Sequence, residues 1–215
     1  MDQAIARNAD YSYAWANRGL AGRTAAIYCL DTGENPSQDI ERARADLDHA
    51  LSLNSQLFWA YPEETAVELL AARWAMRNGV SPRPYFAAAA AAAENAIAAN
   101  SQNPVAYQSA AEVHRWHAEW RLAQGQSVRA DLIEGQRLIE RALQRNPGFA
   151  NAMVTDAALK TIQAESEPDP RIRSALSSDA ASSLRKALEA NPLLAHETRE
   201  LNERIIVAAA NPEIS

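Results

Sequence analysis

The stretch Ala142-Leu143-Gln144-Arg145-Asn146-Pro147 decides the fold, because its first five residues form a pattern that returns along the whole chain. The pattern is Ala-[Ile/Leu]-x-x-Asn. It occurs at residues 4–8, 50–54, 96–100, 142–146 and 187–191, so successive asparagines stand 46, 46, 46 and 45 residues apart. Repetition at a fixed period of about 20 to 50 residues is typical of stacked repeat architectures. The chain is therefore expected to repeat one structural module.

Other positions keep the same period and indicate two helices in each repeat. A large side chain follows the asparagine by seven residues and a small one by eleven, which places both on one face of a first helix, helix A. A glycine then ends helix A, and helix B runs to the next asparagine. The recurring residues are Trp15, Tyr61, Tyr107 and Met153 (large), Gly19, Thr65, Ala111 and Ala157 (small), Tyr28, Trp74 and Trp120 (aromatic, late in helix A), and Gly33, Gly79 and Gly125 (terminating).

These signals predict alternating helices over nearly the whole chain. Helix A is expected at residues 11–32, 57–78, 103–124 and 149–165, and helix B at 36–53, 82–99, 128–145 and 172–190. The repeats span about residues 9–54, 55–100, 101–146 and 147–191 of a single domain, 1–215, and a polar capping helix follows at about 195–210. Residues 1–7 look like the end of an earlier helix B, so we expect the chain to be a fragment of a longer protein.

The repeats resemble tetratricopeptide repeats (TPRs) through the large and small residues of helix A and the alanine of helix B at 50, 96, 142 and 187. This resemblance implies an all-α fold, a right-handed α-solenoid of about four stacked helical hairpins with a terminal capping helix. Two features depart from the family. The usual repeat has about 34 residues, so the helices here should be longer. The leucine normally found before the small residue is replaced by Arg18, Glu64, Ala110 and Asp156, so that contact is missing or rearranged.

A second resemblance concerns the turns between helices A and B. Elongated repeats with turns such as Gly79-Val80-Ser81-Pro82 and Asp169-Pro170-Arg171 are similar to tracts found downstream of the catalytic domain in some large bacterial serine/threonine kinases. It implies a bacterial regulatory parent protein and says nothing about activity in this piece.

Composition excludes several classes of function. The 215 residues carry 21 basic and 27 acidic side chains, a net charge of −6, which is unfavourable for gripping nucleic-acid phosphates. The longest apolar run, residues 85–93, is too short to cross a membrane, which needs about 20 residues. A single cysteine, Cys29, excludes an internal disulfide and suits a reducing compartment. With no basic and apolar leader at its start, the protein is expected to be cytoplasmic.

The TPR resemblance also implies a binding surface, because stacked hairpins leave a concave face lined by helix A. Aromatic and arginine side chains dominate binding hot spots. Trp59 and Trp116 have an alternative reading as core residues of lengthened helices. The residues expected to bind a partner on the concave face are Tyr13, Arg23, Trp59, Gln108, Glu112, Arg115, Trp116 and Asn151.

The sequence contains no complete catalytic or metal-binding motif. His114 and His117 lie three residues apart, on one helix face, and could begin a zinc site with a third ligand such as Glu68. Solvated or partly packed histidines are the favoured interpretation. Cys29 is interpreted as a structural thiol. No phosphate-binding glycine loop or nucleophile elbow is present. We expect no metal, no cofactor and no enzymatic activity.

The sequence thus predicts a non-enzymatic interaction module that binds a peptide or partner domain on its concave face, with neither nucleic acid nor membrane as partner. The alternative is a structural spacer or self-association region, in which the exposed solenoid ends form a homodimer. A third hypothesis, an enzyme built around His114 and His117, lacks a complete set of acid–base or ligand groups.

Overall fold

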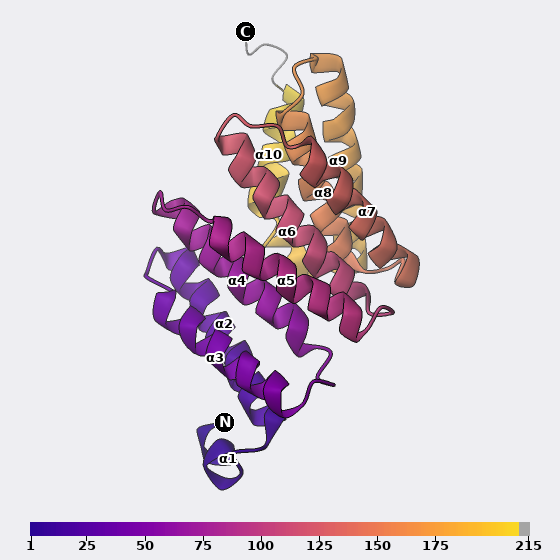
Figure 1. The fold of residues 1–215 in the computed structure, drawn as a ribbon. Coiled ribbons are helices and arrows are strands. Elements are labelled where there is room, and N and C mark those ends of the chain that lie inside the picture. The colour runs from indigo at the N-terminus through magenta and orange to yellow at the C-terminus, as the bar shows by residue number, and fades with distance from the viewer. Residues whose placement is uncertain (211–215) are drawn as a thin grey trace. The chain divides into compact units, whose positions relative to one another are not determined.

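A computed structural model describes residues 1–210, and this part of the chain is all-helical, with no strand. The longer helices follow one another through short connections (Figure 1). In order they are α1 (Asp2–Arg7), α2 (Ser12–Thr32), α3 (Ser37–Leu53), α4 (Ala60–Arg77), α5 (Arg83–Ala99), α6 (Pro104–Ala123), α7 (Arg129–Arg145), α8 (Ala150–Glu165), α9 (Pro170–Ala190), a 3₁₀ turn (Pro192–Ala195) and α10 (Arg199–Ala210).

The predicted helices are confirmed, with each end of helices A and B within three residues of its expected place. The start of helix α4 is shifted most, from residue 57 to Ala60, and the predicted capping helix begins at Arg199 instead of 195. Residues 1–7, expected to be helical, contain α1.

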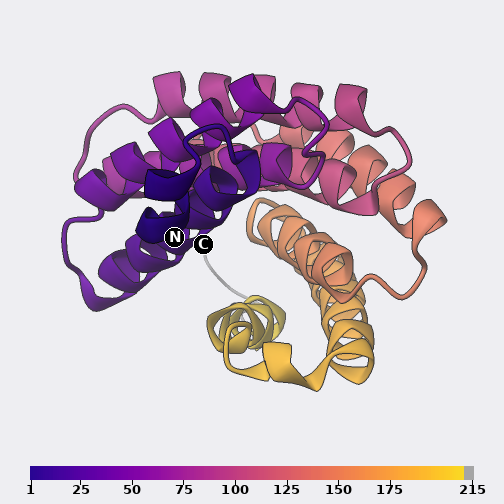
Figure 2. The ribbon, with the colours of Figure 1, turned by 90° about the horizontal axis from the view of Figure 1, so that it is seen from below.

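Helices that are adjacent in sequence pack as hairpins: α2 with α3, α4 with α5, α6 with α7, and α8 with α9. The chain divides into two compact parts. The N-terminal part, residues 1–102, holds α1 to α5, and the C-terminal part begins at Asn103 and holds α6 to α10. In the C-terminal part, α10 packs on α8 and α9, and Figure 2 shows these orange and yellow helices side by side.

The recurring asparagine has one conformation at all five of its positions. It follows the last residue of α1, α3, α5, α7 and α9, with φ between −152° and −141° and ψ between 91° and 98°. In each copy its side-chain Oδ1 accepts a hydrogen bond of 3.0–3.2 Å from the backbone N–H two residues later. An asparagine side chain readily makes this local turn. The repeated residue therefore sets the angle between each helix B and the helix A that follows it.

Removing one of these turns should cost measurable stability. We expect Asn54→Ala to lower the free energy of unfolding by about 1 kcal/mol, the usual value for losing a side-chain hydrogen bond to backbone at a helix end. Asn54→Asp keeps the acceptor oxygen for Gln56 N–H and serves as the matched control. Urea denaturation monitored by circular dichroism measures both variants. Equal losses for alanine and aspartate would contradict the assignment to the turn.

Glycine ends helix A where the sequence predicted it. Gly33, Gly79 and Gly125 have φ of 81°, 68° and 66°, the left-handed region that other residues adopt only with strain. Gly19 acts differently, since a Cβ at that position would lie 2.7 Å from the Cγ of Leu47. The small residue of helix A therefore allows helices α2 and α3 to approach closely.

The residue directly before the small residue of helix A forms polar links between helices in two hairpins. Arg18 of α2 donates to both carboxylate oxygens of buried Asp46 in α3, each at 2.7 Å. Asp156 of α8 accepts a hydrogen bond from the Ser183 hydroxyl of α9 at 2.6 Å. The contact at this position is therefore polar in both hairpins. Because Asp46 is buried, its link to Arg18 fixes which helix packs against α2 as well as the spacing between the two helices.

Candidate partner-binding surface

The predicted residues of the N-terminal part differ in their exposure. Tyr13 of α2 has 46% of its surface exposed, and its ring centroid lies 6.0 Å from that of Tyr11. Arg23 places Nε 2.6 Å from Glu63 Oε2, although the two are not aligned as a hydrogen bond. Burial raises the pKa of the Glu63 carboxyl, and the nearby Arg23 charge opposes that rise. Trp59, directly before α4, is partly buried against the hydrophobic core, which fits its alternative reading as a core residue.

Polar residues of α6 and α8 meet at the Thr155 hydroxyl. Gln108 donates from Nε2 to this hydroxyl at 3.1 Å, and Glu112 Oε1 lies 2.7 Å from it. The carbonyl of Asn151 is 3.0 Å away, while the Asn151 residue itself is exposed at the start of α8. Three predicted residues are thus brought together, and two of them already share a hydroxyl within the protein.

Arg115 and Trp116 form a neighbouring plate on α6. The Arg115 guanidinium lies 3.9 Å from the centroid of the Trp116 ring, at the distance of a cation–π contact. Two carboxylates lie beside the guanidinium: Arg115 Nη1 donates to Glu112 Oε2 at 3.4 Å, and Nη2 lies 3.8 Å from Glu119 Oε1. The Arg115 Nε is buried and donates no hydrogen bond to any group in residues 1–210.

An arginine of α10, missed by the sequence analysis, joins three helices. Arg204 donates to Glu119 of α6 at 2.7 and 3.2 Å and to Glu165 of α8 at 2.9 and 2.6 Å. Burial alone would lower the pKa of Arg204, but the hydrogen bonds to both carboxylates outweigh it and raise that pKa. The repeat gave no signal for it, because the residues 13 positions after the first four asparagines are apolar: Ala21, Val67, Val113 and Leu159.

The two histidines of α6 share one buried carboxylate. Nδ1 of His117 lies 2.9 Å and Nδ1 of His114 lies 3.3 Å from Oδ1 of Asp131 on α7. Burial raises the pKa of Asp131, yet the hydrogen bonds and charges of both histidines outweigh it and hold that pKa below its ordinary value. Arg121 approaches the other oxygen, Oδ2, at 3.6 Å.

The third ligand considered for a zinc site has another partner. Both imidazoles point Nδ1 at the same carboxylate oxygen of Asp131. Glu68, the third ligand considered from the sequence, is bound instead by Arg44, whose Nη2 donates to Glu68 Oε2 at 2.9 Å. Across residues 1–210, no group of three His, Cys, Asp or Glu side chains is placed to hold a metal ion.

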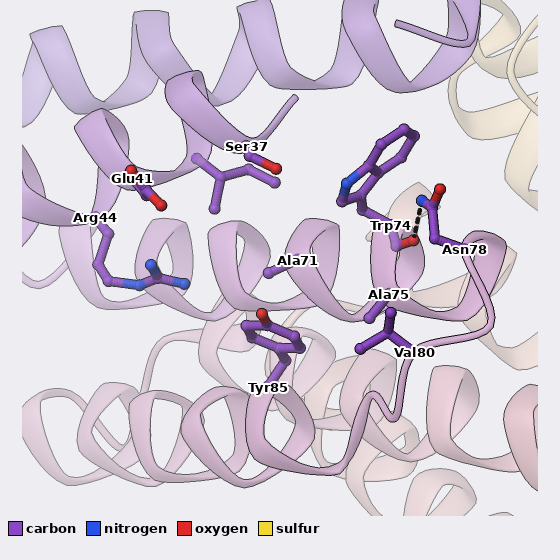
Figure 3. A pocket seen from close by; sticks show the side chains of 10 residues that line it. Ser37, Glu41, Arg44, Ala71, Trp74, Ala75, Asn78, Val80 and Tyr85 are labelled. Carbon is purple, nitrogen blue, oxygen red and sulfur yellow. Dashed lines mark hydrogen bonds between the residues drawn. The ribbon is translucent and has the colours of Figure 1, made fainter. Parts of the chain in front are cut away.

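A cavity of about 250 Å³ lies among helices α3, α4 and α5 of the N-terminal part (Figure 3). Trp74 and Tyr85 form aromatic walls, Ala71 and Ala75 belong to the α4 wall, and Arg44 projects in from α3. The sequence analysis did not place a pocket here, although the recurring aromatic at Trp74 was a signal. The complete lining is Ser37, Ile40, Glu41, Arg44, Ala71, Trp74, Ala75, Asn78, Val80 and Tyr85.

A second, wider cavity of about 530 Å³ lies beside α10 in the C-terminal part. Its lining combines four acidic and two basic residues with polar and apolar ones. Arg204 and Glu165 are already bound to each other, and Arg173 donates to the carbonyls of Glu167 and Pro168. The lining residues are Glu165, Ser166, Glu167, Pro168, Arg173, Glu200, Glu203, Arg204, Val207 and Ala208.

Comparison with known proteins gives no family for this chain: no family model matches it, and no curated protein matches it. Among the helices within residues 1–210, none has the length and apolar character needed to cross a membrane.

Proposed function

We propose that this chain is a non-enzymatic protein–protein interaction module built of TPR-like hairpins stacked as a right-handed solenoid. The observation that carries the proposal is the tandem hairpin, closed at each repeat by the same asparagine turn. A single hairpin cannot cover its own apolar face, so repeated hairpins favour stacking. Stacked helices offer an extended face, which suits a peptide or a partner domain better than a closed reaction chamber.

The helix A residues supply the contacts for that partner. The exposed ring of Tyr13 and the Arg115–Trp116 plate combine apolar surface with hydrogen-bond donors, as binding hot spots do. The Arg115 guanidinium lies 3.4 and 3.8 Å from the Glu112 and Glu119 carboxylates, longer than a close ion pair, so an acidic group of the partner can compete for it. Gln108 and Glu112 hold their geometry through Thr155, which keeps this part of α6 preorganised.

Loss of two arginines should remove partners selectively. From an extract of the source organism, R23A/R115A is expected to capture at least one protein about tenfold less than wild type does, because a truncated hot-spot arginine costs about 1.4 kcal/mol or more. Quantitative mass spectrometry measures the captured proteins. Arg137→Ala, which removes an exposed arginine paired only with Glu134, is the matched control. Identical captured sets for wild type and R23A/R115A would contradict binding at these residues.

A structural spacer or self-association region, within a larger regulatory protein such as a bacterial kinase, is the second candidate. One observation favours it: apolar side chains near the end of the described chain are exposed, with Leu193 at 86%, Ile206 at 57% and Val207 at 58%. Such side chains suit contact with another copy. Sedimentation over a concentration series separates the candidates, because a spacer that associates through its ends should dimerise without any ligand.

A further inference from the structure

Two aromatic side chains of residues 1–210 line the cavity of Figure 3 without a hydrogen bond or a cation over their rings. Trp74 of α4 and Tyr85 of α5 are partly buried against the hydrophobic core, and both rings border the same space. Within the described chain, neither the indole N–H nor the phenol hydroxyl forms a hydrogen bond, and no guanidinium or ammonium group lies over either ring. Both rings are therefore available to an occupant of the cavity.

Other aromatic residues of this protein already carry an arginine. The Arg18 guanidinium lies 4.7 Å from the centroid of the Trp15 ring, and that of Arg115 lies 3.9 Å from the centroid of the Trp116 ring. A cation over an aromatic face is attracted by the electron-rich face of the ring. The two walls of the cavity offer the same kind of surface without a cation from the chain itself.

The charged side chains around the cavity leave one carboxylate uncompensated. Arg44 of α3 donates from Nε and Nη2 to Glu68 of α4, at 2.5 and 2.9 Å, so its positive charge is matched. Glu41, one turn before Arg44 on α3, is an exposed residue of the lining and has no hydrogen bond or ion pair within residues 1–210. One guanidinium beside two carboxylates gives the site a net negative charge.

The space in the cavity depends on residues that the next repeat does not share. Ala71 belongs to the α4 wall, opposite Tyr85, whose hydroxyl points toward it in Figure 3. At the equivalent positions, 46 residues later, the chain has His117 and Asp131. Nδ1 of His117 lies 2.9 Å from Oδ1 of Asp131, so these two side chains contact each other where the second repeat leaves room. The cavity is therefore a particular feature of the second repeat.

We propose that this cavity binds the guanidinium group of an arginine side chain from a partner peptide. A planar guanidinium stacks on Trp74 and Tyr85, donates to the Glu41 carboxylate and finds a further acceptor in the Tyr85 hydroxyl. Its positive charge balances the net negative charge of the site. Arginine fits better than lysine, because an ammonium group is more strongly hydrated and has no flat face to stack.

Two features favour a side chain of a peptide over a free small molecule. The cavity volume of about 250 Å³ is below the range of about 300–1,000 Å³ that is usual for small-molecule pockets. Val80 in the lining is 57% exposed, so it offers apolar surface to the residues that flank the arginine. None of the helix A residues of the proposed function lines this cavity, so the two proposals are independent.

Titration with an arginine peptide tests the site. The probe is acetyl-Gly-Gly-Arg-Gly-Gly-amide, added at low salt and followed through the indole Nε1–H signals in ¹H–¹⁵N spectra. Trp74→Phe identifies the Trp74 signal among the five tryptophans. We expect a saturable shift of that signal. The same peptide with citrulline, a neutral isostere of arginine, should bind about tenfold more weakly or worse, because it loses both the ion pair and the cation–π contact.

Two charge-neutralising variants locate the binding. Glu41→Gln should weaken binding of the arginine peptide about threefold, the usual size for a partly exposed ion pair. Glu94→Gln neutralises an exposed carboxylate of α5 outside the cavity lining, and as the matched control it should bind as wild type does. R23A/R115A should also bind the probe normally, which distinguishes a failure of the helix A face from a failure of this site. Circular dichroism checks the fold of each variant, and the citrulline comparison needs no variant.

Any of four results would refute the site. A wild-type titration without saturation would show that no specific site exists. Equal affinity for the arginine and citrulline peptides would mean that charge is not recognised. Equal affinity for the matched lysine peptide would overturn the assignment to arginine. An equal loss in Glu41→Gln and Glu94→Gln would mean that the probe senses only the general negative charge of the protein.

Discussion

Replacing Asp131 by alanine is expected to lower the free energy of unfolding by about 3 kcal/mol at pH 7, among the largest effects of any single substitution here. The Asp131 side chain is 8% exposed and holds His114, His117 and Arg121 around it. Removing one member of a buried charged cluster typically costs about 3–5 kcal/mol. The lower end applies because the three partners are 28–35% exposed and can be partly hydrated without it.

The pH dependence of this variant separates charge from packing. The folded-state pKa of Asp131 is depressed, so its stabilisation is present above the unfolded pKa and is lost as the pH falls through the folded value. The difference between wild type and Asp131→Ala should therefore shrink in acid. Urea titrations from pH 3 to pH 7 measure it. Asp131→Asn keeps the volume but not the charge, and should be intermediate. A difference that stays constant down to pH 3 would mean that the carboxylate charge contributes nothing.

The helical framework could be predicted because its signals are local. The asparagine at residues 8, 54, 100, 146 and 191 contacts only the backbone two residues further on, so its spacing carries the helix ends directly. The glycines at 33, 79 and 125 meet an equally local requirement, a backbone with positive φ. Such requirements are the same in every repeat, and periodicity reveals them.

Contacts between side chains of different helices were harder to predict, because each repeat solves them with different residues. Arg18 pairs with Asp46, and Asp156 accepts a hydrogen bond from Ser183, and the sequence spacing gave no sign of either partner. Arg204 stands where the other repeats carry apolar side chains, and its two carboxylate partners are 39 and 85 residues away. The pocket of Figure 3 likewise depends on three helices at once. Spacing within one helix does not contain this information.

Glu64 makes a contact that differs between repeats, and this contact makes the stability of the fold depend on pH. It stands directly before Thr65, the small residue of helix A in that repeat. Burial raises the pKa of the Glu64 carboxyl to about 8 from an ordinary value of 4.5, and the charge and hydrogen bond of Asp48 and the charge of Glu68 add to this rise. Arg44 binds Glu68 and partly offsets its charge. Glu64 is therefore protonated in the folded protein at pH 6, and its carboxyl O–H donates a hydrogen bond to the Asp48 carboxylate.

Raising the pH should therefore weaken the fold. Because the folded pKa lies above the unfolded value, the stabilisation from Glu64 is complete below about pH 4.5 and is lost as the pH rises through about 8. Because Glu64 is only partly buried, solvent screens this effect, and we expect a loss of about 1–2 kcal/mol between pH 5 and pH 9, well below the full linkage value. Glu64→Gln cannot ionise, so it should match wild type near pH 5 and exceed its unfolding free energy at pH 9. Parallel profiles for the two proteins would show that Glu64 ionises normally, and that α3 and α4 tolerate adjacent carboxylates without cost.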